Sequence, residues 1–167
     1  MNIKNNVDVY EMTAARDNRL QTQTSLINET GLPLISFTLN IPGSEKNNSI
    51  FKKIHDSGIS EIESLFSASI KKALNRDLKT GLEAYFSIDL DPYSIKEKTI
   101  EIEEKHKLGR IFDIDVINPN LKSISRIEVN KESRKCLLCN NPASICSRNR
   151  SHTVPELIKK IEEIFHS

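Results

Sequence analysis

Apolar and polar residues alternate in several stretches of the chain, and in the segments between these stretches the apolar residues recur with helical spacing. The alternation predicts strands over residues 34–41, 83–90 and 111–117, because successive side chains of a strand point to opposite faces. A further strand over 123–129 would follow a turn at 118–120 and pair with the preceding strand as a hairpin. The pattern therefore indicates a small sheet.

Helical spacing fills the stretches between these strands. Residues 8–29 are expected to form the first helix, which ends at a Gly-x-Pro stop. A short helix over 50–54 would end before Gly58, and a longer helix would then run over 59–73 with one apolar face.

The second half of the chain carries two more helical patterns. Asp91 and Pro92 are a good N-cap and first-turn pair for a helix over 93–107, although a strand over 99–103 competes with this interpretation. Thr153 opens a final helix. Its buried stripe is expected to consist of Leu157, Ile158, Ile161, Ile164 and Phe165.

These elements predict an α/β (α+β) fold, with a small mixed or antiparallel sheet flanked by helices. The 167 residues suffice for one domain, so residues 1–167 are expected to fold as a unit. No apolar run is long enough for a membrane span, and the N-terminus lacks the apolar core of a secretory signal. A cytoplasmic protein is therefore expected, and three cysteines within eleven positions suit a reducing compartment better than a disulfide framework.

Two aspartates interrupt the apolar strand over 111–117. Asp113 and Asp115 are one pleat apart and share a face, whereas Phe112, Ile114 and Val116 can point into a core. Aspartate is disfavoured in strands, and two like charges at this spacing repel. A bound divalent cation would turn that cost into a binding site, although a solvent-facing hairpin strand explains the pair equally well.

The residues around this strand favour a phosphate-bearing ligand. Gly109 would let the backbone approach a phosphate closely, and Arg110 can bind two phosphate oxygens at once. Residues 122–150 hold seven basic and two acidic residues, a net charge of +5 in a chain whose total is +1. This basic segment suits a polyphosphate ligand, and a solvated loop is its simpler explanation.

A cysteine and histidine pattern follows in the same segment. Cys136, Cys139, Cys146 and His152 supply three soft sulfur ligands and one nitrogen, a set that suits structural Zn²⁺. The second half of the pattern lacks a close ligand pair. Three reduced cysteines in a loop, with His152 near a helix start, explain the pattern equally well.

Five motifs together resemble one family. In order along the chain they are Arg16-Asp17-x-Arg19, His106-x-Leu108-Gly109-Arg110-x-Phe112-Asp113-Ile114-Asp115-Val116, Ile124-Ser125-Arg126, Arg134-Lys135-Cys136-Leu137-Leu138-Cys139 and Cys146-x-Arg148-x3-His152. They resemble the holo-acyl-carrier-protein synthases of citrate lyase, also called apo-citrate lyase phosphoribosyl-dephospho-CoA transferases. Ala15, Lys107 and Ile111 depart from the residues usual in that family, and none of them is a proposed ligand.

The resemblance implies a nucleotidyltransferase reaction. The donor would be 2′-(5″-triphosphoribosyl)-3′-dephospho-CoA, the acceptor a serine of the small acyl-carrier (γ) subunit of apo-citrate lyase, and the released product diphosphate. It also implies no nucleic-acid or membrane partner. The transfer resembles that of polymerase-β-type nucleotidyltransferases, so the fold is expected by analogy to be nucleotidyltransferase-like.

The same resemblance implies roles for particular residues. Asp113 and Asp115 would hold Mg²⁺ (or Mn²⁺) on the triphosphate, and His106 or a third carboxylate such as Glu101 is a candidate base. The expected phosphate-binding residues are Gly109, Arg110, Arg126, Arg16, Arg19, Arg134, Lys135 and Arg148. Read without the family, Arg16 and Arg19 would be a solvated helix face, and Arg126 could pair with a neighbouring glutamate such as Glu101, Glu103 or Glu128.

Two other functions fit the sequence. The same reaction could act on the carrier subunit of a related lyase or decarboxylase. The chain could also be a non-enzymatic, zinc-stabilised module that binds nucleic acid or protein through the basic segment, and such a module would bind in a salt-sensitive way and tolerate Asp113→Asn.

Overall fold

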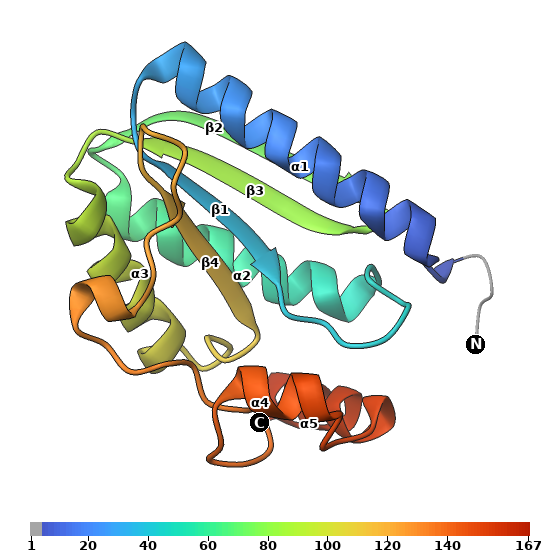
Figure 1. Cartoon of the computed structure of the whole chain (residues 1–167). Helices are drawn as coiled ribbons and strands as arrows, with labels where there is room; N and C mark the ends of the chain where they lie inside the picture. Colours follow the sequence, from blue (N-terminus) through green and yellow to red (C-terminus); the bar gives the residue numbers. More distant parts are fainter. Residues whose placement is uncertain (1–4) are drawn as a thin grey trace.

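The computed structural model describes residues 5–167 and contains one four-stranded antiparallel sheet with helices on both faces (Figure 1). The strand order is β2-β3-β1-β4. The strands are β1 (Leu34–Leu39), β2 (Ile70–Leu78), β3 (Gly81–Ile88) and β4 (Phe112–Ile117). The expected small α/β domain is therefore confirmed, and its sheet is antiparallel throughout.

Helices cover the sheet and one of its ends. They are α1 (Val9–Thr30), α2 (Ser49–Phe66), α3 (Pro92–Lys105), α4 (Ala143–Asn149) and α5 (Val154–His166), with a 3-10 turn η2 (Ile127–Val129). Helix α1 crosses one face of the sheet and α2 the other, while α4 and α5 lie beyond the sheet (Figure 1). Helix α1 begins with a capping box between Asp8 and Glu11 and ends at Gly31, whose φ of 66° suits glycine. None of the helices in residues 5–167 has the length and apolarity that crossing a membrane would need.

The two faces of the sheet differ in chemistry. The face toward α2 is apolar and carries the core, including Ile35, Phe37, Ala84, Phe86, Phe112, Ile114 and Val116. The face toward α1 carries polar side chains from three adjacent strands, because Ser36 pairs with both Tyr85 and Asp115, and Thr38 pairs with Asp113. The sheet therefore uses one face for stability and presents polar groups on the other.

One helix replaces the two expected over residues 50–73. Helix α2 runs through Gly58 without interruption. A Cβ at that position would lie 2.3 Å from Cζ of Phe37 and 3.2 Å from Cε1 of Phe112. Gly58 therefore allows the helix to pack close to the sheet and does not end it. The sequence pattern alone could not distinguish between these two roles of a glycine.

The prediction of a helix over 59–73 was wrong at its end, where strand β2 begins at Ile70. Strand β2 lies at the edge of the sheet, and most of its residues are exposed or only half-buried, so it lacks a clear apolar alternation. The competing strand over 99–103 was also wrong, since those residues belong to α3.

The expected hairpin partner of β4 was wrong as well. Residues 123–129 contribute only a single bridge, between Ser123 and Ile117, followed by η2. Side chains cover the edge of β4 instead. Glu103 accepts a hydrogen bond from the Ile114 N–H at 3.0 Å, and Arg134 donates to the Phe112 carbonyl. These contacts satisfy backbone groups that a partner strand would have used.

Candidate active site and cysteine–histidine cluster

The two aspartates of β4 lie on the polar face of the sheet, beneath α1. Their strand positions are fixed by the buried residues between and beside them, Phe112, Ile114 and Val116. Asp113 is half-buried and accepts a hydrogen bond from the Thr38 hydroxyl at 3.5 Å. The expected shared face of the two carboxylates is thus present in the structure.

The electrostatics of this pair are those of an incompletely neutralised carboxylate site. Although Asp115 keeps an exposed surface, desolvation by the surrounding protein and then the Asp113 carboxylate raise its pKa above the usual range. Lys96 and Arg19 lower the pKa of Asp115 through space, but the net shift stays upward. Ionised Asp115 therefore has an unmet demand for positive charge.

Two arginines of α1 lie over the same face. Arg16 and Arg19 line a cavity of about 210 Å³ together with Asp113, Thr38 and Lys46. Helical spacing of three places both guanidinium groups on the sheet side of α1. The structure thus brings Arg16 and Arg19 to the cavity over Asp113, where Arg19 is half-buried and Arg16 stays exposed.

Glu83 is a buried carboxylate that the sequence reasoning missed. It lies on β3, and its side chain pairs with Arg19 at 3.3 Å and with Arg76 at 3.4 Å. The Tyr85 hydroxyl donates to Glu83 at 2.6 Å, and burial, followed by the hydrogen bond to Glu83, raises the pKa of Tyr85 above its usual range. The signal was the alternation within 81–88, where Glu83, Tyr85 and Ser87 interrupt an otherwise apolar strand.

Lys46 is a second residue that the motifs did not reveal. Its ammonium group donates to the Ile41 carbonyl in the loop after β1. Burial, and then the positive charge of Arg16, lower the pKa of Lys46. The cavity over Asp113 thus gathers three cationic side chains, Arg16, Arg19 and Lys46, from two separate segments.

The structure does not bring His106 or Glu101 to the aspartates. His106 follows α3, lies 3.4 Å from the Ser57 hydroxyl through Nε2 and packs against Phe112, which belongs to the apolar face. Its Nδ1 accepts the Leu108 N–H at 3.0 Å, which explains a structural role at the end of the helix. Glu101 is exposed and pairs with Lys105 on the surface of α3.

Gly109 and Arg110 also lie away from the polar face. A Cβ on Gly109 would approach the backbone oxygens of Glu103 and Ile102 to 2.4 and 2.5 Å, so close packing against α3 accounts for this glycine. The exposed Arg110 donates to the carbonyl groups of Lys135 and Cys136. These hydrogen bonds connect the residues just before β4 to the cysteine-containing segment.

The basic segment divides into paired and free positions. Arg126 pairs with Glu103 and, at 3.3 Å, with Glu104, so its charge is already balanced by two of the nearby glutamates. Arg134 lies 3.7 Å from a carboxylate oxygen of Asp113 and is thus the one residue of the segment that contacts an aspartate of β4. Lys135 and Arg148 are exposed, Lys135 beside a bridge to Pro142 and Arg148 on α4.

The four residues of the cysteine and histidine pattern lie together beyond the end of the sheet. One ligand atom from each of Cys136, Cys139, Cys146 and His152 lies within 4.8 Å of the others. The Asn141 backbone N–H, and then the His152 and Cys146 side chains, lower the pKa of the Cys139 thiol. This Cys3His cluster is compatible with a structural metal.

Comparison with known proteins identifies related chains. A family model described as apo-citrate lyase phosphoribosyl-dephospho-CoA transferase matches residues 7–167. A protein of Vibrio cholerae serotype O1 (strain M66-2), named probable apo-citrate lyase phosphoribosyl-dephospho-CoA transferase, is 35% identical over 96% of this chain and 92% of its own length. A protein of Escherichia coli O1:K1 / APEC, named apo-citrate lyase phosphoribosyl-dephospho-CoA transferase, is 30% identical over 96% of this chain and 89% of its own length.

Proposed function

The chain belongs to the apo-citrate lyase phosphoribosyl-dephospho-CoA transferase family, and from this premise we propose that it attaches that prosthetic group to the acyl-carrier subunit of apo-citrate lyase. The proposed donor is 2′-(5″-triphosphoribosyl)-3′-dephospho-CoA and the proposed acceptor is a serine hydroxyl. The observation that carries the proposal is the carboxylate pair on one strand face, with Asp113 at a cavity that three cationic side chains also line.

The residues at this site fit a divalent cation. Asp113 and Asp115 offer oxygen ligands on one strand face, and desolvation, followed by the Asp113 carboxylate, raises the pKa of Asp115. Magnesium, or manganese in its place, would neutralise charge developing on the leaving diphosphate when it is bound there. We propose that these two aspartates hold it.

The cationic side chains would bind the phosphate chain of the donor. Arg16, Arg19 and Lys46 line the cavity over Asp113, and Arg134 approaches the same carboxylate from the edge of the sheet. Arginine suits this task because its guanidinium group can bind two phosphate oxygens at once. We therefore propose that these four residues, and not Gly109, Arg110 and Arg126, make the main contacts with the phosphates.

The transfer would proceed by displacement at one phosphorus atom. The serine oxygen forms a bond to the phosphorus nearest the ribose, and the bond from that phosphorus to the diphosphate oxygen breaks. The hydroxyl proton passes to a base, for which Glu83, the remaining carboxylate of this face, is a closer candidate than His106 or Glu101.

We assign no step of the transfer to the Cys3His cluster, whose ligand set suits structural Zn²⁺. The exposed Lys135 and Arg148 are proposed to attract the donor or an acidic carrier surface through long-range charge, since neither lies in the cavity over Asp113.

The decisive experiment is intact-mass spectrometry of the apo-carrier subunit after incubation with this protein, the triphosphoribosyl donor and Mg²⁺. A mass gain equal to the phosphoribosyl-dephospho-CoA group is expected, and EDTA should abolish it. Asp113→Asn and Asp115→Asn should each lose the transfer, whereas Asp89→Asn, an exposed aspartate just after β3, should retain it. Full activity of both aspartate variants would refute the metal assignment.

A negative result with folded carrier and competent donor would refute the citrate lyase assignment. The carrier subunits of related lyases and decarboxylases would then be tested under the same conditions, because the cavity over Asp113 contacts the donor and does not define the carrier. Salt-sensitive binding to nucleic acid without any transfer would instead support the binding-module alternative.

A further inference from the structure

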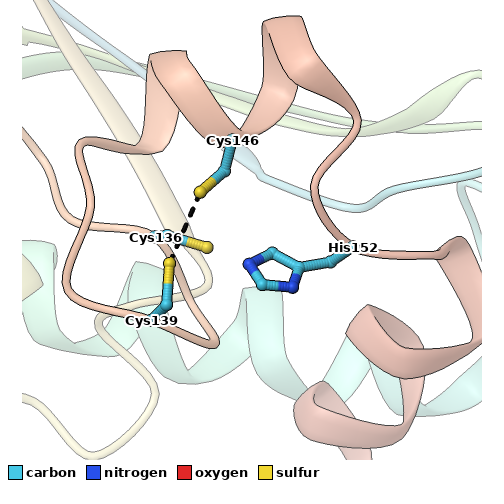
Figure 2. Close-up of side chains that lie close together, drawn as sticks. All are labelled: Cys136, Cys139, Cys146 and His152. Carbon is cyan, nitrogen blue, oxygen red and sulfur yellow. Dashed lines mark hydrogen bonds between the residues drawn. The ribbon is translucent and has the colours of Figure 1, made fainter.

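The Cys3His cluster combines residues from two neighbouring turns and a short helix. Cys136 and Cys139 lie in a turn closed by the bridge between Lys135 and Pro142, Cys146 lies on α4, and His152 precedes α5. Figure 2 shows the three sulfur atoms facing one another and the imidazole ring pointing toward them. Cys136 and Cys146 are 4% and 6% exposed, whereas Cys139 and His152 are half-buried.

The histidine of this cluster is incomplete without a ligand. Its Nε2 atom is buried and has no hydrogen-bond partner within residues 5–167. A buried polar nitrogen without a partner costs free energy, and its presence calls for an explanation such as a missing ion. The neighbouring thiol groups do not replace that partner well, because a thiol is a weak hydrogen-bond donor and acceptor.

We propose that Cys136, Cys139, Cys146 and His152 hold one tetrahedral Zn²⁺ ion as a closed, structural site. Zinc binds thiolate sulfur at about 2.3 Å and imidazole nitrogen at about 2.0 Å, so sulfur atoms of a tetrahedral site lie about 3.8 Å apart. The Cys139 and Cys146 sulfur atoms are 3.4 Å apart, and all four ligand atoms lie within 4.8 Å of one another. Small rotations of the side chains therefore complete the site.

The ion would stabilise a segment that has few other anchors. Within residues 130–152, only Cys136 and Cys146 are buried side chains. Backbone hydrogen bonds from Cys136 to Asn141 and from Ala143 to Arg134, both 2.8 Å, close the turn on itself. A metal crosslink in so small a unit replaces the hydrophobic core that the unit lacks.

The same segment reaches the candidate active site through Arg134. Its guanidinium group donates to the carbonyls of Phe112 and, at 2.9 Å, Arg110, and lies 3.7 Å from Asp113. Arg110 in turn donates to the Cys136 carbonyl. Zinc would therefore act as a positioning element, because it fixes the turn that holds Arg134 against β4.

Metal analysis of the intact protein tests the proposal without any assay of transfer. Protein purified without chelator and without added zinc is expected to contain about one zinc per chain. Replacement with Co²⁺ should give the visible absorption of a tetrahedral ion and a strong sulfur-to-cobalt charge-transfer band. A zinc content near zero together with a featureless Co²⁺ spectrum would overturn the proposal.

Two variants keep the test specific. His152→Gln removes a ligand, so it should weaken zinc binding at least about 10-fold in competition with a chelator and should shift the Co²⁺ spectrum. The control is His166→Gln, a histidine at the end of α5 outside the cluster, which should leave both measurements unchanged. If His152→Gln does not fold, the Co²⁺ spectrum of the unaltered chain still decides the question.

A disulfide is the other outcome that the short Cys139 to Cys146 distance allows. Thiol titration of the denatured protein with Ellman's reagent should count three thiols if the cluster holds zinc and one if those two cysteines are crosslinked. One thiol and no metal would therefore refute the zinc site. Neither measurement depends on the proposed transferase reaction, so failure of one proposal leaves the other intact.

Discussion

Replacement of Gly58 by alanine tests whether this glycine is required by packing between α2 and the sheet. The new Cβ would lie 2.3 Å from Cζ and 2.6 Å from Cε1 of Phe37. Relief of that overlap needs a shift of about 1 Å, since ordinary contacts between carbon atoms are about 3.5 Å. Phe37 cannot give way easily, because its ring stacks on His55 at 4.7 Å and contacts the Phe112 edge at 5.3 Å.

Two opposing effects set the size of the change. Insertion of a methyl group into a filled core costs about 1–3 kcal/mol, whereas the change from glycine to alanine inside a helix gains about 1 kcal/mol. Because the overlap at Phe37 is severe, we expect a packing cost in the upper part of that range, about 2–3 kcal/mol, and therefore a net loss of about 1–2 kcal/mol in the free energy of unfolding. For a chain of this length the loss corresponds to a fall in Tm of about 2–8 °C.

Urea denaturation followed by circular dichroism measures this loss. The midpoint should fall while the slope m stays unchanged, which marks a change in stability alone. Ser60→Ala, at an exposed position of α2, is the matched control and should be neutral or slightly stabilising. A Gly58→Ala variant as stable as the Ser60→Ala variant would refute the packing argument and would suggest that the helix bends or shifts at this point.

Three further predictions concern the polar face. Asp115→Asn should raise stability at pH 7 in EDTA, because the raised pKa of Asp115 means that its ionisation destabilises the fold. Thermal melts at pH 7 and below pH 3.8, the ordinary pKa of aspartate, check this, since the gain should vanish at the lower pH. Glu83→Gln should cost about 3 kcal/mol in urea denaturation and weaken donor binding, because it leaves Arg19 and Arg76 without their shared carboxylate; unchanged stability would contradict that network. Arg134→Lys should raise the KM for the donor about 10-fold in the carrier-modification assay with a smaller effect on kcat, since lysine cannot form the paired contacts; an unchanged KM would remove Arg134 from the site.

The local patterns predicted the strands that carry the core and the aspartates. The alternation around Asp113 and Asp115 was readable because one face of β4 is fully apolar. Strand β2 was missed because an edge strand with mostly exposed residues shows no such contrast. Gly58 was misread because a glycine that ends a helix and one that permits close packing look alike in a sequence.

Long-range contacts explain what the site prediction lacked. Gly109 and Arg110, which were predicted to bind phosphate, lie away from the aspartates, where Gly109 packs on α3 and Arg110 donates to the cysteine-containing turn. Lys46 reaches the cavity over Asp113 through the loop after β1, and Glu83 is connected to that cavity through Arg19 and the pairing of β1 with β3. Such proximity depends on strand order, which spacing along the chain does not specify.

The attachment of α1 connects the stability of the polar face with the proposed function. Leu26 and Ile27 are the only apolar α1 side chains among the described residues that are buried, and they anchor its C-terminal end in a small cluster with Leu34. Its middle and N-terminal end make polar contacts, those of Arg19 with Glu83 and of Glu11 with Lys79. Because Glu83 already pairs with Arg19, a donor whose phosphates bind Arg16 and Arg19 would compete with Glu83 for the Arg19 guanidinium group. Donor binding and the position of α1 should therefore be coupled.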